Sequence, residues 1–197
     1  MKKILFLILI INFIFQTNLF ADDLRNVTFS QKIESTRNGV VFDGRTFIKD
    51  GMVRLEYKTG DMDSISVIKS RNIYSYFPKI KAGKRELMVT EPYELVDPKI
   101  FQSKEMLYEF LNNMQAKEIG KETIDSKNCI IYEYVDLRTE INNKLWVWEH
   151  YGIPIKRQVS EPGIDNIVTI SYYDIEVDVE IDSTLFDIPG DIVWEGE

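Results

Sequence analysis

The residues that could carry covalent or metal chemistry are few in this chain of 197 residues. It contains one cysteine, Cys129, and one histidine, His150. A nucleophilic triad needs a histidine base beside a nucleophile motif, and the Trp-Glu-His-Tyr stretch around His150 contains no such motif. A zinc site needs more nitrogen and sulfur ligands than these two residues supply. We therefore predict a protein that is not an enzyme and that has no metal site and no cofactor.

Cys129 lies at the start of the apolar run Cys129–Tyr132. A lone cysteine cannot form an intramolecular disulfide, and a reactive thiol would need a neighbouring base to lower its pKa. Nothing in the sequence places the single histidine near it, and the apolar run favours a small buried side chain. We predict a structural role for this cysteine.

Acidic side chains are the most abundant candidates for catalysis. The chain has 32 acidic and 24 basic residues, and its net charge is −8. Paired carboxylates can hydrolyse glycosidic bonds, but so many acids make chance pairs frequent, and no pair stands out. A phosphate backbone is bound by a surface rich in lysine and arginine, so this acidic composition excludes nucleic acid as an expected partner.

The first 21 residues have the order of regions that is typical of a secretory signal peptide. Lys2 and Lys3 are followed by the apolar stretch Ile4–Phe15, and then by a short polar stretch and Ala21. The apolar stretch is shorter than the roughly 20 residues that a membrane-spanning helix needs. We expect cleavage after Ala21, which leaves a soluble periplasmic monomer with a single domain, residues 22–197. Because the removed segment carries two lysines and no acid, the net charge of the mature chain is −10.

Alternation of apolar and polar residues predicts strands along most of the mature chain. It begins at Val27 and recurs in segments up to Val177. Asn38-Gly39 and Asp50-Gly51 are turn signals of the kind that join hairpins, which favours an antiparallel sheet. The segment Lys79–Phe101, with several basic residues and two prolines, shows no such pattern. We expect it to leave the sheet as a long excursion, and loops of that length are often lids.

One helix is predicted over about Lys104–Gln115. Ser103 precedes it as an N-cap, and Glu105 lies in the first turn, where an acidic side chain favours the helix dipole. Its apolar stripe on a 3.6-residue period consists of Met106, Leu107, Phe110, Leu111 and Met114. Near the end of the chain, we expect Asp182–Pro189 to form a short turn that inserts Leu185 and Phe186 into an edge of the core.

These elements predict a mainly β (α+β) protein, a single curved antiparallel sheet of about ten or eleven strands. Such a large sheet tends to curl, and the open half-barrel would wrap around one or more helices that cover its apolar concave face. Two arrangements remain possible. The apolar side chains fill the core, or they leave an apolar cleft in which the soft side chains of Met106 and Met114 repack around an acyl chain.

Four stretches of the sequence carry recognisable motifs. Asp50–Tyr57 is similar to a G-x-x-R-x-E/W-Y strand, and Ile119–Tyr132 is similar to a G-x-E-x-(I/V)…Y hairpin. Leu145–Lys156 resembles a W-V…G-(L/I)-P-(L/I)-K strand pair, and Asp182–Pro189 resembles a closing D-S-x-F-x-(I/L)-P segment. The first motif resembles the periplasmic lipoprotein-localisation (LolA/LolB-like) superfamily, and the other three resemble its outer-membrane lipoprotein-sorting relatives. The four stretches occur in the same order and span most of the mature chain.

The resemblance implies an eleven-strand half-barrel that is closed by helices around a cavity for lipid chains. In the carriers an arginine on an early strand holds the helical lid shut, and Arg54 matches its position. The expected function is therefore a periplasmic carrier that shields an acyl chain of a lipid or lipoprotein. Its expected ligand-binding residues are Arg54 and the helical stripe Met106, Leu107, Phe110, Leu111 and Met114. The alternative is an envelope lipid sensor or interaction module of the same fold that acts, without catalysis, through a membrane-associated protein partner.

Overall fold

The computed structural model describes residues 24–37, 39–59, 61–70, 72–87, 99–136 and 140–195. The predicted signal peptide, residues 1–21, lies outside the described residues, and so does most of the second half of the predicted excursion, residues 88–98. No helix in the described part of the chain combines the length and the apolar composition that crossing a membrane would require.

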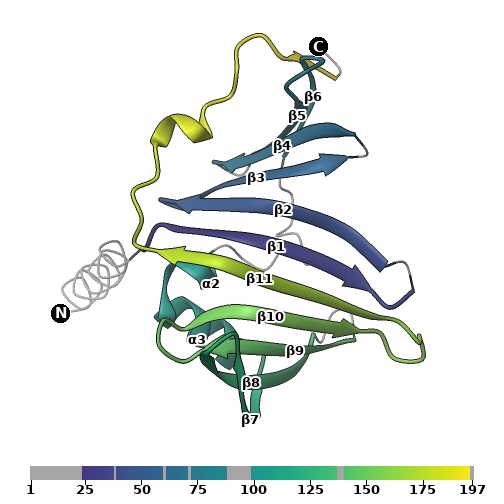
Figure 1. Ribbon diagram of the computed structural model, residues 1–197, viewed down its shortest axis with the longest axis vertical. Helices are drawn as coiled ribbons and strands as arrows, with labels where there is room; N and C mark the ends of the chain where they lie inside the picture. The colour runs from purple at the N-terminus through teal and green to yellow at the C-terminus, as the bar shows by residue number, and fades with distance from the viewer. Residues whose placement is uncertain are drawn as a thin grey trace, which may run out of the picture.

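The described residues form one open sheet of twelve strands (Figure 1). The strands are β1 (Val27–Ser35), β2 (Gly39–Lys49), β3 (Met52–Thr59), β4 (Met62–Lys69), β5 (Asn72–Phe77), β6 (Ala82–Leu87), β7 (Lys117–Ile124), β8 (Lys127–Asp136), β9 (Ile141–Trp148), β10 (Ile153–Ser160), β11 (Ile167–Val177) and β12 (Val193–Trp194). Their order across the sheet is β12-β6-β5-β4-β3-β2-β1-β11-β10-β9-β8-β7. Two hairpin meanders, β1–β6 and β7–β11, therefore meet where β1 pairs with β11.

The mainly β class and the single open sheet are confirmed, but three details of the prediction are wrong. The sheet has one strand more than predicted, and it is mixed, because β12 pairs with β6 in parallel. A strand that arrives through a long connection is free of the antiparallel constraint that a hairpin imposes. The predicted excursion Lys79–Phe101 also contains the strand β6, whose largely exposed residues at the sheet edge leave no apolar alternation to read.

Two short helices, α2 (Lys99–Gln102) and α3 (Lys104–Asn113), form the second layer. Ser103 is the N-cap as predicted, since its hydroxyl accepts a hydrogen bond from the backbone N–H of Met106 at 3.3 Å. Backbone N–H and the Ser103 hydroxyl also lower the pKa of Glu105 in the first turn. Figure 1 shows both helices against the part of the sheet that contains β8–β11. The helices thus cover part of one face, which supports the predicted wrapping of the sheet around them less than it supports the open sheet itself.

The two faces of the sheet bury different segments. We call the face that carries the helices, together with Val53 and Leu55 of β3, the helix face, and we call the opposite face the outer face. The C-terminal segment, residues 178–195, crosses the outer face of β2–β6, where it buries Ile181 and Phe186 in a second apolar cluster. It contains the 3-10 helix η1 (Ser183–Phe186). The predicted short turn forms and packs both Leu185 and Phe186 into apolar surroundings, but these lie in the second cluster on the outer face and not at an edge of the main core.

Candidate ligand-binding face

Helix α3 packs its stripe onto the helix face. Leu107 and Leu111 are buried, and Phe110 and Met114 are half-buried against the same cluster. The ring of Phe110 meets that of Tyr134 edge to face, with 5.6 Å between the centroids. Met106 is half-buried but is not among the described residues that pack in this cluster. The structure therefore brings four of the five predicted helix residues together.

Helix α2 is anchored by an aromatic group at the centre of the sheet. Phe101 of α2 stacks on Phe29 of β1 with 4.6 Å between centroids, and Tyr172 of β11 meets both rings edge to face. All three side chains are buried, and burial raises the pKa of the Tyr172 hydroxyl. Beneath the helices, side chains of the protein itself fill the core.

A hydrogen-bonded junction joins Arg25, which precedes β1, to α2 and to the turn after β9. The backbone N–H of Arg25 donates to the carbonyl oxygen of Gln102 at 2.9 Å, and its guanidinium donates to the carbonyl oxygens of Gln102 and Tyr151 at 3.3 and 2.8 Å. The side chain of Gln102, which is fully buried, donates back to the carbonyl oxygen of Arg25. Sequence patterns gave no signal for this junction, because its acceptors are backbone carbonyl groups.

The helix face continues beyond the helices onto β2–β5. Ile48 of β2, Val53 and Leu55 of β3 and Ile68 of β4 are buried members of the same apolar cluster as α3. Ile73 of β5 packs beside them. Within the part of the chain that the structure describes, α2 and α3 lie over the other half of the sheet (Figure 1). This part of the helix face is thus a buried apolar layer, the kind of lining that holds a hydrocarbon chain.

Arg54 is on the outer face, away from the helical stripe. It alternates with Val53 and Leu55, and its guanidinium donates to the carbonyl oxygen of Leu185 and to Glu56 Oε1, both at 2.8 Å. The resemblance implied that this arginine holds a helical lid, whereas these hydrogen bonds hold the C-terminal segment. The expectation of a contact with the helices is corrected, since alternation along β3 turns Arg54 to the opposite face.

Arg54 is one of three cationic side chains with the same task. Lys49 of β2 donates to the carbonyl oxygen of Ile181 at 2.7 Å, and Lys69 of β4 donates to that of Phe186 at 2.9 Å. Three adjacent strands thus each supply one cation to a carbonyl group of the C-terminal segment. Sequence reasoning missed this set, because the spacing between the strands says nothing about the segment that crosses them.

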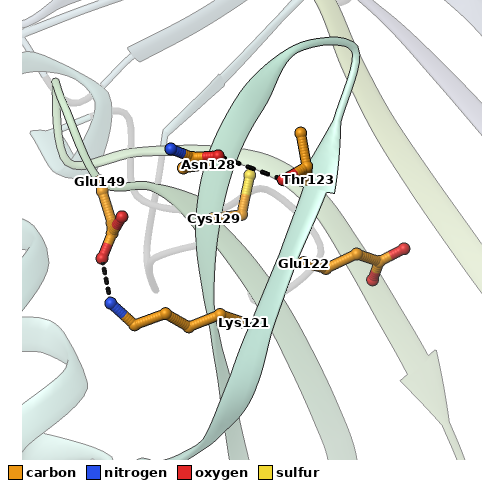
Figure 2. Close-up of a pocket in the computed structure, with 6 residues that line it drawn as sticks. All are labelled: Lys121, Glu122, Thr123, Asn128, Cys129 and Glu149. Carbon is orange, nitrogen blue, oxygen red and sulfur yellow. Dashed lines mark hydrogen bonds and ion pairs between the residues drawn. The ribbon is translucent and has the colours of Figure 1, made fainter.

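Figure 2 shows a polar hollow of about 270 Å³ at the free edge of the sheet, near the β7–β8 hairpin. It is lined by Lys121, Glu122, Thr123, Asn128, Cys129 and Glu149. Lys121 and Glu149 point toward one another and form an ion pair at 2.5 Å, and Thr123 donates a hydrogen bond to Asn128 Oδ1. These polar groups are therefore engaged with one another.

The two residues with the greatest intrinsic reactivity have structural surroundings. Cys129 is buried, its thiol donates to the carbonyl oxygen of Lys127 at 3.1 Å, and burial raises its pKa, which disfavours the nucleophilic thiolate. The prediction of a buried structural cysteine is confirmed. The ring of His150 packs against Trp148 and Tyr151. Among the described residues, no group of three or more histidine, cysteine, aspartate or glutamate side chains is placed to hold a metal ion.

The chain resembles known proteins in its fold. No protein-family model and no curated protein matches the chain. The chain is similar in structure to an uncharacterized conserved protein from Thermus thermophilus, with a TM-score of 0.60, 8% identity, and coverage of 89% of this chain and 93% of the other. It is also similar to a chain of the Pseudomonas aeruginosa MucA/MucB complex, with a TM-score of 0.55 and 10% identity, covering 87% of this chain and 58% of that chain.

A weaker structural match carries the name of the superfamily that the motifs resemble. A LolA superfamily protein from Nitrosomonas europaea aligns over 86% of this chain and 92% of its own, with 11% identity and a TM-score of 0.39. The low identities limit all three likenesses to the fold, so ligands and partners must be argued from the residues of this chain.

Proposed function

We propose that this protein is a non-enzymatic periplasmic carrier that shields an acyl chain of a lipid or lipoprotein on the helix face of its sheet. The observation that supports the proposal most strongly is the continuation of the apolar cluster from α3 onto β2–β5, where Ile48, Val53, Leu55 and Ile68 extend beyond the described helices. Removal of each methylene from water contributes roughly 0.8 kcal/mol, so a long chain supplies ample binding free energy.

The proposal assigns the helices a boundary role. Leu107 and Leu111 are packed into the core, so they fix α3 on the sheet, and Phe110 and Met114 are half-buried on the same half of the helix face as α3. The acyl chain would lie along β3–β5, with Ile73 and Tyr57 at its sides. Arg54 is not part of this site.

Native mass spectrometry of residues 22–197, purified from the producing cell envelope without detergent, tests the proposal. We expect a lipid-sized adduct, and we expect a fluorescent acyl probe to bind the stripped protein. Ile73→Gln should weaken probe binding at least tenfold, whereas the matched control Ile119→Gln, at an exposed position on the far edge strand β7, should leave it unchanged. A protein that carries no lipid adduct and does not bind the fluorescent acyl probe would overturn the proposal.

A second candidate is an interaction module that binds a protein partner. The chain of the MucA/MucB complex shares this fold, and the eight-residue strand β7 has a neighbour on one side only in the described sheet. Free strand edges can accept an extended peptide as a further strand. Crosslinking in intact cells, from a residue placed at position 119 of β7, would recover one defined membrane-associated partner. Recovery of that partner from a protein without a lipid adduct would favour this function over the carrier.

A further inference from the structure

A line of hydroxyl groups crosses the apolar helix face of β2–β5. The pairing register places Thr46 opposite Leu55, Leu55 opposite Ser66, and Ser66 opposite Ser75, so these residues form one row across four strands. The hydroxyl of Tyr57, on the same face of β3, lies 3.2 Å from Ser66 Oγ, and Ser66 Oγ lies 2.9 Å from Ser75 Oγ. Polar groups at buried positions of an apolar face lower stability unless they are hydrogen-bonded.

Thr46 is the residue of this row that points to a ligand. Its side chain is 3% exposed, and Thr46 Oγ1 has no hydrogen-bond partner among the described residues. A buried hydroxyl that lacks a partner has a proton to donate and no water to accept it. A ligand that carries a hydrogen-bond acceptor next to an apolar chain would supply the partner that the Thr46 hydroxyl lacks.

We propose that Thr46 marks the polar end of the acyl site, where its hydroxyl donates a hydrogen bond to the carbonyl oxygen of an acyl ester. This inference rests on the proposed carrier function and deepens it, because it names the chemical group next to the chain. Val53 and Ile68, which pair with one another on β3 and β4 two positions further along, supply the apolar contact for the first methylenes. A pure hydrocarbon would fill the apolar part and leave the hydroxyl of Thr46 without an acceptor.

The experiment compares an ester with a hydrocarbon of matched length. Methyl palmitate and hexadecane compete for the fluorescent acyl probe on the whole mature chain. We expect the ester to compete about threefold to tenfold better than hexadecane on the wild type, the ratio that one net hydrogen bond provides. Thr46→Val, which keeps the shape and removes the hydroxyl, should abolish this preference while hexadecane competes as before. Ser66→Ala, which removes a hydroxyl that already has Tyr57 and Ser75 as partners, and Thr169→Val, on the outer face of β11, are the controls that should leave the preference intact.

Thermal unfolding without ligand gives a second, independent readout. If the hydroxyl of Thr46 is kept for a ligand, Thr46→Val removes a buried group without a partner and should raise the melting temperature by about 2–4 °C. A lowered melting temperature would mean that the hydroxyl supports the fold, and this would overturn the inference.

The outcomes separate this inference from the proposed function. If neither methyl palmitate nor hexadecane displaces the probe because the probe itself does not bind, the carrier function fails. If both compete equally on wild type and Thr46→Val, the acyl site stands and the polar end is wrong. A second pair of competitors identifies the ester: displacement by a diacylated lipopeptide assigns it to a lipoprotein, displacement by short-chain phosphatidylglycerol assigns it to a glycerolipid, and displacement by neither overturns the inference.

Discussion

Replacing Arg54 with methionine tests which element this side chain holds in place. Methionine keeps an unbranched apolar stem and removes the guanidinium, so the substitution isolates the hydrogen bond to the Leu185 carbonyl and the ion pair with Glu56, both at 2.8 Å. The structure predicts a loosened C-terminal segment and a lower free energy of unfolding. A latch on the helices would instead change ligand release and leave the stability unchanged.

The magnitude follows from burial. The Arg54 side chain is 11% exposed, and a hydrogen bond from a charged donor in such surroundings contributes about 1.5–3 kcal/mol. The Glu56 side chain is 40% exposed, so the ion pair adds at most about 1 kcal/mol. We expect a loss of about 2 kcal/mol, which corresponds to a fall in melting temperature of about 4–8 °C for a domain of this size.

The assay is urea unfolding followed by tryptophan fluorescence, because Trp194 belongs to the segment that should loosen. The control is Arg45→Met on the same outer face. Arg45 is 54% exposed and its ion pair with Glu176 spans 3.8 Å, so its loss should cost no more than about 0.5 kcal/mol. Equal losses for the two arginines, or a change in probe release by Arg54→Met without a change in stability, would refute the reasoning.

Three further predictions follow from close packing and from burial. Gly83→Ala should lower the free energy of unfolding by about 1–3 kcal/mol, because a Cβ there would lie 2.8 Å from both Trp194 and Tyr76. The control Gly190→Ala, whose Cβ would have nothing within 4 Å, should leave the melting temperature unchanged in the same thermal melt. Leu107→Ala should lower it by about 2–5 kcal/mol in urea unfolding, and Met106→Ala, outside the cluster, by much less. Burial raises the pKa of Cys129 above its ordinary 9.0, so iodoacetamide at pH 8 should alkylate the native protein far more slowly than the unfolded one. The same shift favours the folded state below pH 9, and this contribution should disappear as the pH rises through the higher pKa of the folded protein.

Local patterns predicted much of the fold. The hairpin at Asp50-Gly51 forms with both residues at positive φ, 49° and 74°, as the Asp-Gly pair requires. The Ser103 cap and the apolar stripe on α3 were predicted from residue type and residue spacing. Strand β6 could not be predicted, because its largely exposed residues near the sheet edge need no apolar alternation. The parallel pairing of β12 could not be predicted either, because it depends on where a long connection ends.

The candidate site was predicted less well than the fold, for a definite reason. Sequence spacing identified the helix residues that share a face. The contacts of Arg54 depend on which segment covers each face of β3, and the resemblance implied the helices where the structure has the C-terminal segment. The junction of Arg25 with Gln102 and the row from Thr46 to Ser75 consist of residues far apart in the chain, joined by strand register. A single sequence does not contain that register.

Among the described residues, the outer face of β8–β10 and the helix face of β2–β5 carry different side chains, and this difference supports β2–β5 as the proposed site. On the outer face of β8–β10, lysine side chains lie over the tryptophans: Lys144 and Lys156 over Trp146 at 5.7 and 4.5 Å, and Lys127 over Trp148 at 5.4 Å. The aliphatic stems of lysine cover apolar surface while their ammonium groups stay in water, so this face is well suited to contact with solvent. The described side chains on the helix face of β2–β5 include no charged residue, only aliphatic and aromatic groups and the hydroxyl row. Such a face is unsuited to water and suited to a ligand that is mostly hydrocarbon with one polar group.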